Sequence, residues 1–299
     1  MKHLLTLIFA FAAIFDTAAQ RSLAKVEHGA DKVIVHWNNK TAPHSNYITE
    51  KERIDEKMNV FNTTEMEMFV YPARGKATGQ GMIVVPGGGY GKVCVQWDGF
   101  SVARYLQSVG VTAIVVKYRL PNNGYEEVPY EDVREALRYM RANGKKLGID
   151  PAKVGIVGAS AGGHLAGWIS TTLPVEERPQ HAILIYPVIT GNMIYGKPNS
   201  YSRLLGNDRT ATEVEHHSIH NRVDENTPPT LLLYADDDGR VAPHQVTLYY
   251  KALKRYGIES SLRIFPTGKH GWAGHDDYRY DKEIKAAMWD WLVIQNNKK

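Results

Sequence analysis

The chain of 299 residues contains one cysteine, Cys94, so it cannot form an intramolecular disulfide. Its stability must therefore come from a hydrophobic core, and a hydrophobic content of 43% is enough for a large one. Cys94 itself is expected to pack as a small apolar residue. Internal repeats and low-complexity linkers are also missing, which favours one domain over residues 20–299.

Polybasic runs and nucleic-acid-binding motifs are absent as well. The net charge is only +4, and the positive residues are scattered along the chain. This pattern is typical of an ordinary solvated surface, and it predicts no nucleic-acid partner.

No hydrophobic run is long enough to span a membrane. The longest, residues 4–15, is preceded by Lys2 and followed by the small residues Thr17, Ala18 and Ala19. These features predict a secretory signal peptide over residues 1–19, an exported mature chain that begins at Gln20, and no membrane partner after cleavage. A buried first helix is the alternative.

Apolar runs and helical segments alternate from residue 82 to the C-terminus. This order predicts parallel β-α-β units and a three-layer α/β fold, with helices on both faces of a mostly parallel sheet. Residues 20–65 are expected to form a surface arm, and residues 190–229 show no strong period. The predicted strands are 66–71, 82–85, 111–117, 154–157, 181–186, 230–234 and 261–265, and the predicted helices are 100–109, 131–147, 245–256 and 281–294.

Residues 158–162, Gly-Ala-Ser-Ala-Gly, follow a short apolar strand and precede a run of small residues that can open a helix. This is the G-x-S-x-G pattern of a nucleophile elbow. Small neighbours allow the sharp turn on which Ser160 is exposed above the sheet. The helix that follows directs its first free N–H groups at negative charge developing there.

Three further segments directly follow predicted strands: the glycines 87–89, the aspartates 236–238, and His270. The carboxyl ends of parallel strands meet at one edge of a sheet, so these segments are expected to gather around Ser160. The order Ser, Asp, His is that of the α/β hydrolases. The spacing from Asp238 to Val241 favours Asp238 as the acid, and Asp237 is the alternative.

Backbone N–H groups of the Gly-rich loop and of Ala161 are suited to hold an oxyanion. A phosphate cradle is disfavoured, because the loop lacks the Lys-Ser/Thr ending of a P-loop. His216 and His220 have zinc-helix spacing, but His217 stands where the zincin glutamate would be. We therefore predict surface histidines here, with no metal and no cofactor.

Seven segments together resemble the carbohydrate acetyl esterases of the α/β-hydrolase superfamily, in the acetylxylan-esterase-like branch found in exported bacterial proteins. The resemblance implies catalysis by Ser160, Asp238 and His270, with oxyanion contacts from Gly88, Gly89 and Ala161. The segments are 86–90 (PGGGY), 97–99 (WDG), 117–121 (KYRLP), 158–165 (GASAGGHL), 186–190 (YPVIT), 227–229 (TPP) and 268–271 (GKHG).

Several positions depart from the pattern of that branch. Pro86 replaces the histidine that heads the lipase-type loop. Tyr234, Ala242 and Val246 stand where the branch often has histidine, proline and serine. These three changes leave the triad intact, but they bear on the side of the site that holds the leaving group, and hence on which polysaccharide is the substrate.

The expected function is therefore that of an exported serine esterase that removes acetyl groups from plant polysaccharides or oligosaccharides such as acetylated xylan. Tyr90, Trp97 and Trp272 lie beside the site segments and are candidates to stack on sugar rings, with wall or core packing as the alternative. Tyr90 and Trp272 are also expected to wall the acyl side and restrict it to acetate.

Other functions fit the same residues. A feruloyl esterase, a general short-chain carboxylesterase and a prolyl-type peptidase would use the same triad. The peptidase is disfavoured, because such enzymes usually carry an additional propeller domain. A carbohydrate-binding protein on an inactive hydrolase scaffold is a non-enzymatic alternative.

Overall fold

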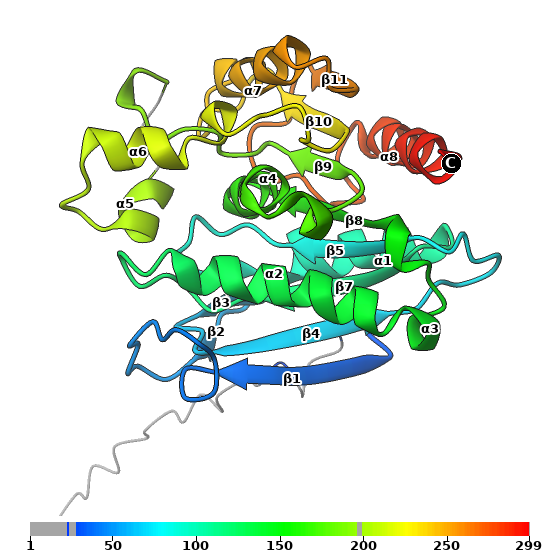
Figure 1. The fold of residues 1–299 in the computed structure, drawn as a ribbon, viewed down its shortest axis with the longest axis horizontal. Helices are drawn as coiled ribbons and strands as arrows, with labels where there is room; N and C mark the ends of the chain where they lie inside the picture. Colours follow the sequence, from blue (N-terminus) through cyan, green and yellow to red (C-terminus); the bar gives the residue numbers. More distant parts are fainter. Residues whose placement is uncertain (1–22, 24–27, 196–198, 299) are drawn as a thin grey trace, which may run out of the picture.

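The computed structural model describes Leu23, residues 28–195 and residues 199–298, and the predicted signal peptide, residues 1–19, lies outside them. A twisted eight-stranded sheet forms the centre of the molecule (Figure 1). Its strands in spatial order are β1 (Lys32–Asn38), β4 (Glu65–Tyr71), β7 (Thr112–Lys117), β5 (Gly81–Val85), β8 (Val154–Ala159), β9 (Ala182–Ile185), β10 (Thr230–Ala235) and β11 (Ser260–Phe265).

The six strands from β7 to β11 run parallel, whereas β1 pairs antiparallel with β4 and β4 with β7. Every residue of β5, β7, β8, β9 and β10 is buried. Helices cover both faces of a parallel sheet, so its strands are continuous apolar runs, which is why the sequence reveals them. The predicted mostly parallel α/β fold is confirmed.

Helices cover the sheet on both sides (Figure 1). α2 and α4 pack against each other on one face, and α1 lies with α8 on the other. The α-helices are α1 (Val102–Ser108), α2 (Glu127–Ala142), α3 (Gly144–Leu147), α4 (Ala161–Thr172), α5 (Ser200–Leu205), α6 (Ala211–His217), α7 (His244–Arg255) and α8 (Asp281–Asn296). None of the helices in the described ranges is long and apolar enough to cross a membrane.

Three regions differ from the sequence-based expectation. The predicted arm over residues 20–65 contributes β1, together with β2 (Arg53–Ile54) and β3 (Asn59–Phe61), which form a small antiparallel sheet with β6 (Val93–Cys94). The helix predicted over residues 100–109 starts earlier, as a π-helical turn at Val95–Ser101. The helix predicted over residues 131–147 is divided at Asn143 into α2 and α3.

The described part of residues 190–229 contains the two short α-helices α5 and α6 in place of a regular β-α unit. α6 begins with a capping box, in which Thr210 and Glu213 bond each other's backbone N–H groups. Figure 1 shows both helices beyond the end of the sheet toward which the parallel strands point. Part of this region is therefore placed to border a site at that edge.

Candidate active site

Ser160 forms a sharp turn between β8 and α4, with φ of 55° and ψ of −120°. This left-handed φ is costly for a residue with a side chain, and the surrounding packing holds it in place. A Cβ at Gly158 would overlap the carbonyl oxygen of Gly162, and one at Gly162 would overlap that of Val85. Glycines on both sides of Ser160 therefore let α4 start directly against the ends of β5 and β8.

The structure brings Ser160, His270 and Asp238 together in one hydrogen-bonded chain. Nε2 of His270 lies 2.8 Å from Oγ of Ser160, and Nδ1 lies 2.7 Å from Oδ2 of Asp238. The other carboxylate oxygen of Asp238 accepts hydrogen bonds from the backbone N–H groups of Arg240 (2.8 Å) and Val241 (3.0 Å). The Asp238 side chain is fully buried. It is thus fixed from both sides.

Asp237, the alternative acid, is placed differently. Its side chain is exposed, and its Oδ1 accepts a hydrogen bond of 2.6 Å from the backbone N–H of Lys269. It therefore supports the loop before His270 rather than the imidazole. Lys269 has a φ of 56°, so this contact stabilises a strained backbone position next to His270.

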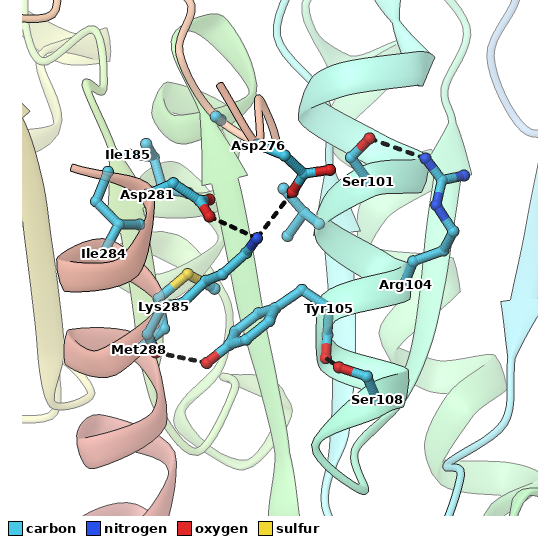
Figure 2. A pocket seen from close by; sticks show the side chains of 13 residues that line it. Ser101, Arg104, Tyr105, Ser108, Ile185, Asp276, Asp281, Ile284, Lys285 and Met288 are labelled. Atoms are coloured by element: carbon cyan, nitrogen blue, oxygen red, sulfur yellow. Dashed lines mark hydrogen bonds and ion pairs between the residues drawn. The ribbon is translucent and has the colours of Figure 1, made fainter. Parts of the chain in front are cut away.

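The segment after His270 is anchored to α1 and α8, the two helices on the face of the sheet opposite α2 and α4. Figure 2 shows Nζ of Lys285, on α8, between Asp276 (2.8 Å) and Asp281 (2.7 Å). The hydroxyl of Tyr105, on α1, donates a 2.5 Å hydrogen bond to the carbonyl oxygen of Lys285. These groups line a cavity of about 420 Å³ that none of the predicted catalytic residues borders. Its walls tie the loop that carries His270 to α1 and α8.

A separate cleft of about 800 Å³ opens at Ser160 and His270, and Gly88 and Gly89 also line it. Within the part of the chain that the structure describes, the N–H groups of Gly88 and Gly89 donate to no protein acceptor. Ala161 is the first residue of α4, where helical N–H groups are free. The three predicted oxyanion donors are therefore at the mouth of the cleft or at the start of α4, beside the nucleophile.

Asp98 is a buried site residue whose chemical role the sequence did not reveal. Its carboxylate accepts hydrogen bonds of 3.0 Å from the N–H of Gly87 and from the hydroxyl of Tyr186. The same hydroxyl accepts a bond from the N–H of Ala273, and the Tyr186 ring lies 4.6 Å from that of His270. Burial raises the pKa of the Asp98 carboxyl. Asp98 and Tyr186 thus connect the Gly-rich loop to the His270 loop.

Residues 118–299 match the prolyl oligopeptidase family. The chain belongs to this family. It is 35% identical over 220 residues to the acetylxylan esterase of Xylanibacter ruminicola, an alignment that covers 72% of this chain and 45% of that protein. It is 31% identical over 232 residues to endo-1,4-beta-xylanase B of Butyrivibrio fibrisolvens, covering 69% of this chain and 36% of the relative. The chain thus spans less than half the length of these curated relatives.

A solved structure matches this member of the prolyl oligopeptidase family over most of its length. It is the acetyl ester-xyloside bifunctional hydrolase from Caldicellulosiruptor lactoaceticus, with a TM-score of 0.72 and 32% sequence identity. The match covers 88% of this chain and 96% of that chain. Together with the acetylxylan esterase, it confirms the predicted resemblance and the α/β-hydrolase fold.

Two of the three aromatic residues expected to contact sugar lie away from the cleft of this family member. Tyr90 is 2% exposed and its hydroxyl is 2.8 Å from Nδ1 of His164, whereas Trp272 is 4% exposed and stacks on Tyr278. Neither lines the cleft, so neither can wall its acyl side. Trp97 does line the cleft; it is 39% exposed and stacks on His275 at 3.9 Å.

Two smaller expectations also need correction. Cys94 is half-buried and borders the cleft, where burial raises the pKa of its thiol to about 12. His217 is not a surface histidine, because its ring is buried against Trp168 at 4.7 Å. Among the described residues, no group of His, Cys, Asp and Glu has the arrangement of a metal site.

Proposed function

We propose that the chain is a serine ester hydrolase that removes acetyl groups from plant polysaccharides or their oligosaccharides, such as acetylated xylan. The observation that carries the proposal is the hydrogen-bonded chain from Asp238 through His270 to Ser160 at the mouth of an open cleft. Similarity to an acetylxylan esterase and to an acetyl ester-xyloside hydrolase supports acetyl esters of carbohydrate as the substrate.

In the first half of the reaction, Nε2 of His270 accepts the proton of the Ser160 hydroxyl as Oγ attacks the acetyl carbonyl carbon. Asp238 accepts the Nδ1 hydrogen bond, which keeps Nε2 unprotonated before the attack and stabilises the imidazolium afterwards. The carbonyl oxygen becomes an oxyanion, held by the N–H groups of Gly88, Gly89 and Ala161.

The intermediate then collapses. The bond between the carbonyl carbon and the sugar oxygen breaks, and His270 returns its proton to that oxygen, so that the sugar leaves as an alcohol. Water then gives a proton to His270 and attacks the acetyl-Ser160 carbonyl carbon. The bond from that carbon to Oγ of Ser160 breaks, His270 returns its proton to Oγ, and acetate leaves. The same residues serve both halves, so the enzyme returns to its starting protonation state.

Peptide hydrolysis is the second candidate, because the family is named for prolyl oligopeptidases. The same triad would attack an amide, with a proton delivered to nitrogen instead of oxygen. A feruloyl esterase, a general short-chain carboxylesterase and a non-catalytic carbohydrate-binding protein stay open as well.

The test uses the mature chain with nitrophenyl acetate, methyl ferulate, a prolyl nitroanilide peptide, and acetylated xylan, mannan and pectin. We expect rapid nitrophenyl acetate hydrolysis, acetate release from at least one glycan, and loss of both in Ser160→Ala. That loss should reach at least about 10³-fold in kcat, because single losses of a triad nucleophile are typically larger. Activity of Ser160→Ala within about tenfold of the wild type would contradict the assignment. Faster cleavage of the anilide or the ferulate than of any acetyl glycan would support the corresponding alternative, and binding without hydrolysis would support the non-catalytic one.

Export to the periplasm or the medium is part of the proposal and rests on the sequence alone. Expression of the full chain in a bacterial host, followed by cell fractionation and N-terminal sequencing, tests it. We expect a mature chain that starts at Gln20 outside the cytoplasm. Retention of residues 1–19 on an active cytoplasmic enzyme would contradict it.

A further inference from the structure

Four basic residues line the cleft that contains Ser160: Lys57, Lys92, Arg203 and Arg240. They come from four separate segments: the turn before β3, the end of the Gly-rich loop, helix α5, and the loop after Asp238. Several separate segments therefore contribute positive charge to the lining of the cleft.

Arg203 contacts the loop of the predicted oxyanion hole directly. Its Nη1 donates a 3.2 Å hydrogen bond to the carbonyl oxygen of Gly89. A Cβ added to Gly91 would lie 2.8 Å from the central guanidinium carbon, so the guanidinium packs closely against the loop at Gly91. The side chain is exposed, and its remaining guanidinium N–H groups donate to no acceptor among the residues that the structure describes, so they can bind a ligand.

Lys92 lies beside the same loop, because a Cβ at Gly88 would come within 3.0 Å of its Cγ. Its Nζ lies 5.9 Å from the centre of the Phe61 ring. Cys94 also borders the cleft; burial raises the pKa of its thiol, and Lys92 and Arg240 are both near enough to act against that rise electrostatically. Lys92 and Arg240 thus lie near the same residue of the cleft wall.

Acidic groups offset this charge only in part. Asp98 is the one carboxylate among the described residues that line the cleft; it is buried, and its two oxygens accept bonds from Gly87 and Tyr186. Asp55 lies close to Lys92, but its carboxylate accepts the backbone N–H groups of Lys57 and Asn59. Within the described ranges, none of the four basic side chains forms an ion pair.

We propose that the cleft selects acetylated glycans that carry a carboxylate, as uronic acids do, and that Arg203 is its principal contact. This inference rests on the proposed function and adds the charge of its substrate. A guanidinium can hold a carboxylate through two parallel N–H bonds, a geometry that favours an anionic sugar over a neutral one. Lys57, Lys92 and Arg240 attract the same substrate at longer range.

The uronic acid can belong to the main chain of the glycan, as in a galacturonan, or to a side group, as in a glucuronoxylan. The shared chemistry is the carboxylate near an acetyl ester. The experiment therefore compares acetylated oligogalacturonides with acetylated xylo-oligosaccharides, the latter separated by anion exchange into neutral and acidic fractions. The measured quantity is kcat/KM for acetate release by the mature chain.

We expect the acidic xylo-oligosaccharides or the oligogalacturonides to exceed the neutral fraction in kcat/KM by about tenfold at low salt, as for one charge-assisted hydrogen-bonded contact. In about 1 M NaCl the ratio should fall toward one, because the Debye length is then about 3 Å. Arg203→Gln should lower the ratio, and Arg203→Lys should keep part of it. The matched control is Arg255→Gln, an exposed change at the end of α7 outside the cleft, which should keep the ratio unchanged.

A ratio near one at low salt in the wild type, with neutral glycan deacetylated, would overturn this inference and leave the proposed function intact. A ratio that stays at the wild-type value in Arg203→Gln would also overturn it. If nitrophenyl acetate is hydrolysed but neither glycan fraction is, the proposed function fails and this inference with it. A preference for either source of uronic acid supports the carboxylate contact. It also identifies whether the recognised uronic acid belongs to the main chain or to a side group of the glycan.

Discussion

Replacing Asp238 by asparagine isolates the role of one buried carboxylate. The two side chains have nearly the same shape, so the change leaves packing almost untouched. Asp238 is fully buried, and each of its oxygens has defined partners: Nδ1 of His270 on one, and the N–H groups of Arg240 and Val241 on the other. All of these groups can donate a hydrogen bond, whereas an asparagine offers one acceptor oxygen and one donor NH₂.

The two possible orientations of the amide have different costs. If its oxygen stays with the two backbone N–H groups, its NH₂ faces Nδ1 of His270, and the imidazole proton moves to Nε2, facing Ser160. His270 then cannot accept the serine proton. If the amide is reversed, the NH₂ faces two backbone donors, and two buried hydrogen bonds are lost at about 1–3 kcal/mol each. The first orientation is therefore favoured, and kcat should fall by about 10⁴, the loss known for the same change in serine proteases.

The assay is nitrophenyl acetate hydrolysis by the purified mature chain, with circular dichroism and a thermal melt to verify folding. Asp237→Asn is the matched control, because it makes the same chemical change one residue away, on an exposed side chain that bonds Lys269. We expect it to lower kcat by less than about tenfold, as for one exposed hydrogen bond. A larger loss in Asp237→Asn than in Asp238→Asn would refute the assignment of the acid.

Two further predictions concern the oxyanion loop and the buried histidines. Gly88 has a φ of 132°, and a Cβ there would overlap the carbonyl oxygen of Lys92, so Gly88→Ala should displace the loop and lower kcat by about 10²–10³, measured as above. Burial lowers the pKa of His164 and of His181 to about 3, so between pH 6.5 and 3 the unfolded chain binds protons that the folded chain does not. Stability should therefore decrease as the pH falls from 7 to 5, by about 2 kcal/mol for each of these histidines, and urea denaturation of His181→Leu should show a decrease smaller by that amount. An unchanged pH dependence in His181→Leu would contradict this.

The parts of the fold that the sequence predicted are those with the strongest physical constraint. β5, β7, β8, β9 and β10 are buried on both faces and so appear as unbroken apolar runs. β1 was not predicted, because it is the edge strand next to β4, with exposed and half-buried residues mixed along its length. Its position depends on pairing, which the local sequence does not show.

The site, like the fold, has residues that the sequence predicted correctly and residues that it did not. Ser160, Asp238 and His270 each follow a strand, so the topology of the sheet brings them to one edge whatever their local sequence. Tyr90 and Trp272 are close to site residues in sequence, but side-chain direction depends on packing, and both point into the core. Sequence proximity was therefore a poor guide to which aromatic residues border the cleft.

Arg203 was not predicted, because α5 belongs to a region without a clear period, and its contact with Gly89 joins positions 114 residues apart. This separation has a consequence for function. The strand-end residues would set how fast any small ester is cleaved, whereas the side chains of Lys57, Arg203 and Arg240 would bind only a substrate large enough to reach them. Nitrophenyl acetate therefore reports on the triad and the oxyanion loop, including the support that Arg203 gives to Gly89, and not on contacts with a larger glycan. Residues of α5 and the loops can therefore change the choice of substrate while the catalytic geometry stays constant. Only a comparison of charged and neutral glycan substrates can reveal this choice.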